Sequence, residues 1–270
     1  MTPSSVPPRI PASQAAFLDD LRRVLRAWRV APLLPVLTLA VAAAQLLSGS
    51  GQPGVAALFG LLSLLLVGWP GAERLWYLRL WTGRTLTVAE AWRATLRCFG
   101  RFFVLALVVG LAVAVLALPV IVAFFRAADF AADGTVSFPD GFPPWAVGYA
   151  VLLTIAGYAV LTFVTPALVY SSRRVRDAIP IGLRLLRVSW PRTWAYVLVP
   201  AVLAGAPSIL VGLEPLGAAT ALATLFSAVV LALGRGAVAA FYLRTVPGAG
   251  PDGDVQLATA PGYYPATPAW

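Results

Sequence analysis

The chain has 270 residues, of which 60% are hydrophobic and only 11% are charged. An ordinary soluble domain carries about 25% charged residues, so this composition excludes a water-soluble surface. The formal net charge is +9, but the arginines cluster at the ends of apolar runs and do not follow one soluble face. That distribution favours anionic lipid headgroups over nucleic acid as the counter-charge.

The residue types that are missing also narrow the chemistry. The sequence contains no histidine, and Cys98 is its one cysteine. An intrachain disulfide and zinc sites built from histidine and cysteine are therefore excluded. Nucleophilic pairs of the Ser-His or Cys-His kind cannot form either. We expect no enzyme activity, no cofactor and no metal ion.

The two ends of the chain differ from its middle. Residues 1–12 are rich in proline and serine, and residues 247–270 are rich in glycine and proline, so both are expected to be disordered. Residues 13–246 form the predicted membrane domain. Its first segment, residues 13–30, is predicted to be an amphipathic helix at the membrane interface. Its apolar residues recur at helical spacing and its arginines fall mostly elsewhere on the wheel: Phe17, Leu21, Val24, Leu25 and Trp28 against Arg22, Arg23, Arg26 and Arg29.

Six further stretches have the apolar length that a transmembrane helix needs, which is about 20 residues, or come close to it. They cover residues 30–47, 55–80, 102–125, 145–170, 194–213 and 216–243. The sequence therefore predicts an all-α, polytopic membrane protein with six transmembrane helices and with cytoplasmic interfacial amphipathic helices.

The arginine distribution predicts the orientation of these spans. The N-terminal arm, residues 74–101, residues 173–192 and Arg244 all fall on one side of a six-helix arrangement. On the other side, the loops carry Arg126 as their one basic residue, together with four acids that are expected to be solvated: Asp129, Asp133, Asp140 and Glu214. The basic side is predicted to face the cytoplasm, so both termini are expected there. The frequent use of alanine, glycine, proline and arginine without lysine suggests a bacterial plasma membrane protein.

Two of the basic segments form an internal repeat. Five residues of the first, Val88, Glu90, Ala91, Leu96 and Arg97, align without gaps on Val175, Asp177, Ala178, Leu183 and Arg184. Each unit is predicted to consist of a membrane helix, an interfacial amphipathic helix and a second membrane helix. In the first unit, Thr87 and Glu90 have the spacing of a capping box, which predicts that a helix begins there.

The arginines of the two repeat helices are the candidate contacts for lipid headgroups. They are Arg93, Arg97 and Arg101 in the first helix and Arg173, Arg176, Arg184 and Arg187 in the second. Each arginine near an anionic leaflet adds about 1 kcal/mol of binding free energy. The simpler interpretation is positive-inside topology with interface anchoring; the alternative is a dedicated site for a headgroup or for a protein partner at the cytoplasmic face.

Two charged residues are expected at membrane depth, where an ionisable group usually faces a partner or a cavity. Arg235 precedes Arg244 by nine residues, which corresponds to about 13 Å of helix, and Glu73 precedes Arg79 by six, or about 9 Å. We predict that Glu73 and Arg235 form an ion pair between helices. Two alternatives stay open: Arg74 competes for Glu73, or the last span ends near Leu233 and Arg235 extends to the interface.

The order of segments resembles a six-helix bacterial family that is related to the membrane domain of glycerophosphoryl diester phosphodiesterase. The matching residues are Gly83, Ala91 and Trp92 before and in the first repeat helix, Pro166, Ala167, Arg184, Leu185 and Trp194 around the second, and Tyr242, Leu243 and Arg244 at the end of the last span. A glutamate common in that family after the fourth helix is replaced here by residues 170–172. No phosphodiesterase catalytic domain is present, so the resemblance implies a membrane fold and not hydrolysis.

Together these observations predict a membrane scaffold or accessory protein that acts through lipid or protein contacts at the cytoplasmic leaflet. The competing interpretation is a small-solute transporter, or the membrane subunit of one. Its site would contain Glu73 and Arg235, beside a fifth span that is interrupted by Pro200 and Pro207. A hydrated cavity at these charges would favour transport, whereas a dry bundle would favour the scaffold.

Overall fold

The computed structural model describes residues 14–48, 53–83, 86–130, 136–137, 141, 143–172, 174–190, 193–211 and 218–246. The helices, in chain order, are α1 Gln14–Val30, α2 Leu33–Ser48, α3 Pro53–Leu65, the 3₁₀ helix η1 Leu66–Gly68, α4 Trp69–Trp81, α5 Val88–Ala127, α6 Pro144–Tyr170, α7 Val175–Ser189, α8 Trp194–Val211 and α9 Ala218–Thr245. The fold is thus helical, as the sequence predicts. The predicted terminal disorder, most of the glycine-rich turn at residues 48–54, and Asp133, Asp140 and Glu214 lie outside the described residues.

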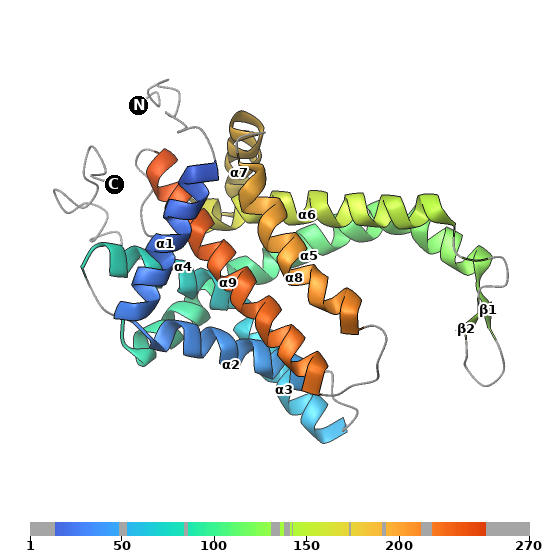
Figure 1. Cartoon of the computed structure of the whole chain (residues 1–270), viewed down its shortest axis with the longest axis horizontal. Helices are drawn as coiled ribbons and strands as arrows, with labels where there is room; N and C mark the ends of the chain where they lie inside the picture. Colours follow the sequence, from blue (N-terminus) through green and yellow to red (C-terminus); the bar gives the residue numbers. More distant parts are fainter. Residues whose placement is uncertain are drawn as a thin grey trace.

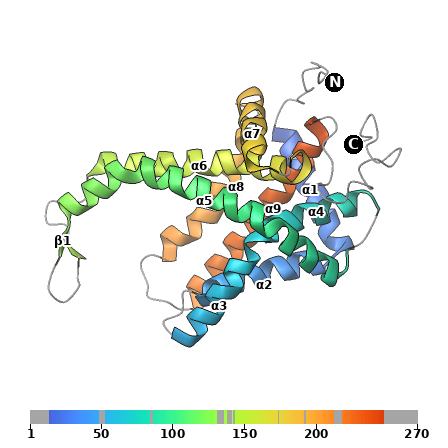
Figure 2. The same ribbon diagram turned by 180° about the vertical axis from the view of Figure 1, so that it is seen from behind.

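Helices α5 and α6 form a long antiparallel hairpin that projects away from the other helices (Figure 1). At its tip, β1 Asp129–Phe130 pairs antiparallel with β2 Val136–Ser137. Figure 2 shows the same projection from behind. Large apolar side chains on the hairpin point outward, for example Leu111, which is 69% exposed, and Leu152, which is 67% exposed. Such a surface is suited to acyl chains and not to water.

By length and composition, three helices can cross a membrane: α5, α6 and the Leu225–Thr245 part of α9. A fourth crossing results if α1 and α2 count as one broken span, because they meet at a bend of 100°. The chain therefore has the helices of a membrane protein. These helices account for three or four crossings among the described residues, whereas the sequence predicts six.

The second predicted span, residues 55–80, is built from three helical pieces. They are α3, η1 and α4, with 13, 3 and 13 residues. Pro70 explains the break, because proline has no N–H to donate to the carbonyl of Leu66 four residues earlier. The backbone tightens into the 3₁₀ turn at that point, and Pro70 then occupies the first turn of α4.

The first repeat unit differs from its prediction in one respect. The amphipathic segment and the span that follows are a single 40-residue helix, α5, and not two helices. Its start is as predicted, because the Thr87 hydroxyl accepts from the Glu90 backbone N–H, and Glu90 accepts from the Thr87 N–H at 2.9 Å, which confirms the capping box. At 1.5 Å per residue α5 is about 60 Å long, twice the thickness of a bilayer core.

In the second unit the chain does break after the amphipathic helix. Helix α7 ends at Ser189, and its C-cap residue Trp190 has an extended conformation with ψ 137°. Trp190 precedes Pro191, and the helical region is disfavoured for a residue before proline. The aligned position in α5 is Val104, which permits the helix to continue. The two units therefore differ in sequence at the point where their helices differ.

The two repeat helices nevertheless share a register. Helices α5 and α7 begin at the aligned residues Val88 and Val175. The positions that they bury also correspond: Ala91, Thr95, Cys98 and Phe102 align with Ala178, Gly182, Leu185 and Ser189, and all eight are buried. A Cβ atom on Gly182 would lie 2.7 Å from the Cα of Val164, so α7 packs on α6 backbone to backbone. The repeat is thus a repeat of packing as well as of sequence.

Helix α1 packs its apolar face on the bundle. Phe17 and Val24 are buried, and the Trp28 indole N–H donates to the Tyr77 hydroxyl of α4 at 2.7 Å. A Cβ atom on Gly236 of α9 would lie 2.8 Å from the Val24 side chain, so α1 and α9 are in close contact at this glycine. The arginine-bearing face of α1, with Arg22, Arg26 and Arg29, is left exposed. The helix is therefore held by protein contacts on its apolar face.

Candidate functional site

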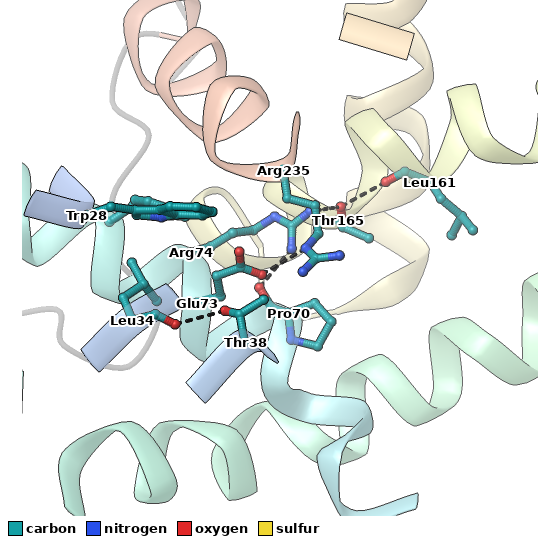
Figure 3. Close-up of polar contacts among 10 residues, drawn as sticks. Trp28, Leu34, Thr38, Pro70, Glu73, Arg74, Leu161, Thr165 and Arg235 are labelled. Carbon is teal, nitrogen blue, oxygen red and sulfur yellow. Dashed lines mark hydrogen bonds and ion pairs between the residues drawn. The ribbon is translucent and has the colours of Figure 1, made fainter. Parts of the chain in front are cut away.

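The predicted partners Glu73 and Arg235 are brought together at the centre of the bundle. Glu73 lies on α4 and is fully buried, and Arg235 lies on α9 with 28% of its side chain exposed. The Arg235 Nε donates to the Glu73 Oε2 at 2.8 Å (Figure 3). Helix α9 itself continues without a break past Leu233 to Thr245. The pair joins two helices that are 162 residues apart in the sequence.

Arg74, the other predicted partner of Glu73, uses different acceptors. Its Nη1 donates to the Pro70 carbonyl and its Nη2 to the Thr165 hydroxyl of α6, both at 2.7 Å (Figure 3). The Tyr170 hydroxyl donates to the Arg74 backbone carbonyl at 2.8 Å. Arg74 is 2% exposed, and its Nε has no hydrogen-bond partner in the described part of the chain. Arg74 therefore fastens α4 to α6, while Arg235 is hydrogen-bonded to Glu73.

Glu73, Arg74 and Arg235 together form what we call the buried charge cluster. An apolar groove of about 530 Å³ runs beside it, and both arginines line this groove. The rest of the lining comes from η1, α4, α5, α6 and α9 and is mainly apolar, with Val67, Phe102, Leu105, Val109, Val113, Leu161 and Val238 among its residues. The sequence pattern predicted the charges but not the groove, because its walls are assembled from separate helices.

A second buried polar site was missed from the sequence. Asp20 of α1 is 2% exposed, and its Oδ2 accepts from the Tyr196 hydroxyl of α8 at 2.6 Å and from Arg244 of α9 at 2.9 Å. One carboxylate thus joins three helices. A signal was present, because Asp20 stands three residues after Phe17 and four before Val24, on the apolar face of α1. An acid in that position needs a buried partner.

The N-terminal part of α5 carries the first group of candidate headgroup contacts. With the end of α4 it forms a pocket of about 200 Å³, here called the arginine pocket, whose charged lining residues are Arg79, Arg93, Arg97, Arg101 and Glu90. Arg79 lies 3.3 Å from the Glu90 carboxylate. Arg93 and Arg97 are exposed and have no hydrogen bond or ion pair to any residue that the structure describes. Among the described residues that line the pocket, four arginines and one glutamate carry charge, so this lining is electropositive.

The apolar face predicted beside these arginines is also on the surface. Trp92 is 43% exposed and Leu96 is 46% exposed, and Phe103 stacks on Phe99 with a centroid distance of 5.6 Å. The guanidinium groups and the apolar stripe are therefore both accessible on the same part of α5. This combination is typical of a helix surface that meets both headgroups and acyl chains.

Helix α7 carries the second group of candidate contacts. Arg176, Arg184 and Arg187 are exposed, and Arg176 lies 3.4 Å from Asp177 in a surface ion pair. Arg173 lies outside the described residues. Helix α7 lies across the end of α6 (Figure 2). The side chains of α7 and of the N-terminal part of α5 are buried on the side that faces the bundle and exposed on the other side.

The chemistry available at these sites is the binding of anions. Guanidinium groups bind phosphates and carboxylates through paired N–H donors. Among the described residues, no three histidine, cysteine, aspartate or glutamate side chains lie close enough together to hold a metal ion. No protein-family model matches the chain, and no similar protein was found among curated proteins or solved structures.

Proposed function

We propose that the chain is a six-span protein of a bacterial plasma membrane, with both termini in the cytoplasm. It has no catalytic activity and acts as a scaffold or accessory protein at the cytoplasmic leaflet. There it makes contacts with anionic lipid headgroups or with a protein partner. Kinship with the family related to the membrane domain of glycerophosphoryl diester phosphodiesterase is part of the same proposal and rests on the residues quoted above.

The arginine pocket is the observation that carries this proposal. Four arginines and one glutamate are the charged residues that line this pocket, and Arg93 and Arg97 among them have no hydrogen bond or ion pair to any described residue. An anion bound there would offset the repulsion among the guanidinium groups. Arg93 and Arg97 are accessible there, and the exposed Trp92 and Leu96 lie next to them on α5. A phosphate oxygen satisfies the guanidinium donors, and the acyl region accepts the apolar side chains.

The contact between the two ends of the membrane domain supports the proposed orientation. Asp20 near the start of α1 binds Arg244 near the end of α9, so these two ends lie side by side (Figure 1). An arrangement with an even number of crossings produces this proximity. The arginines of α1 and of the arginine pocket then lie on the cytoplasmic side, in agreement with the positive-inside rule.

Replacing both Arg93 and Arg97 with glutamine is expected to weaken binding of phosphatidylglycerol about 30-fold, because each arginine contributes about 1 kcal/mol at an anionic surface. Binding is measured by native mass spectrometry of the purified protein with phosphatidylglycerol and phosphatidylcholine in competition. Arg126→Gln is the matched control, since Arg126 is exposed at the opposite end of the same helix. Equal losses in the two variants, or no preference for the anionic lipid in the original protein, would refute headgroup binding at this pocket.

Solute transport is the second candidate, because the apolar groove reaches the buried charge cluster. We expect single cysteines, introduced in a Cys98→Ala background, to distinguish the two functions and to test the topology. A cysteine at Ala106, which lines the groove, is expected to stay unreactive toward a water-soluble maleimide because its surroundings are apolar.

In intact cells, a cysteine at Arg126 is expected to react with the maleimide, and a cysteine at Arg93 is expected to react only after the cells are permeabilised. Rapid labelling at Ala106 would instead favour a hydrated transport path, and the reverse pattern at Arg93 and Arg126 would contradict the orientation.

A further inference from the structure

The buried charge cluster has one more positive charge than negative. Glu73 supplies one carboxylate, while Arg74 and Arg235 supply two guanidinium groups, which remain charged in proteins. Arg74 donates only to the neutral Pro70 and Thr165 oxygens, and its Nε has no hydrogen-bond partner among the described residues. Removing an uncompensated charge from water costs several kcal/mol, so the cluster is expected to attract an anion.

The surroundings of the cluster determine what kind of anion can reach it. Arg74 and Arg235 both line the apolar groove, so an anion bound in the groove reaches them directly. Along α5 the groove extends from Phe102 to Val113, which is about 16 Å at 1.5 Å per residue. Thr165, which binds Arg74, lies on α6 at the Phe102 end of this path, and the remaining wall is mainly apolar. The charged side chains of the groove therefore come from α4 and α9, and its remaining lining is apolar apart from Tyr158, Thr162 and Thr165.

We propose that the apolar groove binds a single-chain anionic amphiphile of the long-chain fatty-acid class. Its carboxylate lies against the Arg74 and Arg235 guanidinium groups, and its acyl chain lies along α5 toward Val113. One carboxylate neutralises the one excess positive charge of the cluster. The groove volume of about 530 Å³ falls within the range of about 300–1,000 Å³ that is typical of small-molecule sites. A single narrow chain matches one elongated groove, whereas a diacyl phospholipid brings a second chain and a larger headgroup.

This proposal does not rest on the proposed headgroup contacts. The arginine pocket ends at Arg101 on α5 and the apolar groove begins at Phe102, so the two sites use different residues of the same helix. Loss of phosphatidylglycerol binding at the arginine pocket and loss of fatty-acid binding in the groove are separate results. Each can occur without the other.

The test measures equilibrium binding of radiolabelled palmitate to the full chain in detergent, with methyl palmitate as the uncharged competitor. Gly110 lines the groove, and a Cβ atom there would meet nothing within 4 Å, so Gly110→Phe fills the groove with little disturbance of the bundle. We expect this variant to bind palmitate at least tenfold more weakly. Gly100→Phe is the matched control, because Gly100 is exposed on the same helix, lies outside the groove and is equally unhindered. Unchanged affinity in Gly110→Phe would overturn the proposal.

The charge requirement is tested with Arg74→Gln. This variant leaves the Glu73 and Arg235 pair in place and removes the excess positive charge, so palmitate is expected to bind about tenfold more weakly and to lose its advantage over methyl palmitate. If Arg74→Gln does not fold, competition on the original protein decides the question. Displacement by palmitate but not by methyl palmitate supports the site. Equal displacement by the two, or stronger displacement by phosphatidylglycerol or inorganic phosphate than by palmitate, would exclude a fatty-acid site.

Discussion

Replacing Glu73 with glutamine is expected to lower the free energy of unfolding by about 3–5 kcal/mol, the range observed when one partner of a buried ion pair is removed. Glu73 is fully buried and is the one acid, among the described residues, that pairs with Arg235. Without its carboxylate, Arg74 and Arg235 would both be left uncompensated beside the apolar groove. The loss is measured from the midpoint of thermal unfolding in detergent, followed by tryptophan fluorescence.

The position of Arg74 predicts an asymmetry between the two partners. In Arg235→Gln the positive charge of the adjacent residue Arg74 remains near the Glu73 carboxylate. We therefore expect a smaller loss of unfolding free energy, about 1.5–3 kcal/mol, which is the contribution of a hydrogen bond to a charged group. The double variant Glu73→Gln with Arg235→Gln restores the original excess of one positive charge and is expected to be more stable than Glu73→Gln alone. Additive losses in this double-mutant cycle would show that the two side chains do not interact.

Replacing Asp20 with asparagine is expected to release α1 from the bundle and to cost about 2–3 kcal/mol of folding free energy. The Asp20 carboxylate is 2% exposed and accepts from both Tyr196 and Arg244, so its charge holds α1 on α8 and α9. The Arg244 side chain, which is 16% exposed, would then lose its counter-charge. Limited trypsin digestion measures the release, because Arg22 and Arg26 lie on α1 and become cleavable when the helix detaches.

Asp19→Asn is the matched control for this prediction. Asp19 is the neighbouring residue and carries the same charge, but its side chain is 66% exposed and its partner Arg22 is 70% exposed. An exposed ion pair contributes little, so we expect a change within about 0.5 kcal/mol of zero and no increase in cleavage of α1. Similar behaviour of the two variants would mean that net charge on α1, and not the buried contact of Asp20, keeps the helix in place.

Several features of the fold followed from local sequence alone. The capping box at Thr87 and Glu90 predicted the start of α5, because this motif needs only residues within one helical turn. The helical spacing of the apolar residues Phe17, Val24 and Trp28 predicted the buried face of α1 in part. The contact between Glu73 and Arg235 was predicted from two segments together, since the rise counted from Arg79 and from Arg244 places both residues at a similar depth.

Other features were predicted incorrectly, for reasons that the sequence contains in retrospect. The first repeat unit was expected to break between its amphipathic segment and its span, but no residue at that point prevents a helix. In the second unit Pro191 supplies the break. The second predicted span, residues 55–80, is divided into α3, η1 and α4 beside Pro70. Hydropathy predicts that a segment is apolar but not where its helix is interrupted. A proline alone does not settle this either, because Pro119, Pro166 and Pro180 lie inside continuous helices.

The sequence by itself determined that this chain is helical and apolar and that its arginines cluster in a few segments, because composition, periodicity and charge distribution are properties of short segments. The tertiary structure alone decided that Asp20 binds Arg244 across 224 residues and that the Arg74 guanidinium donates to Thr165 and not to Glu73. It also decided that separate helices line a groove beside the surplus charge. The physical reason is that these arrangements depend on which helix faces which. Close approach at Gly182 and Gly236 sets that choice, and no local pattern encodes it.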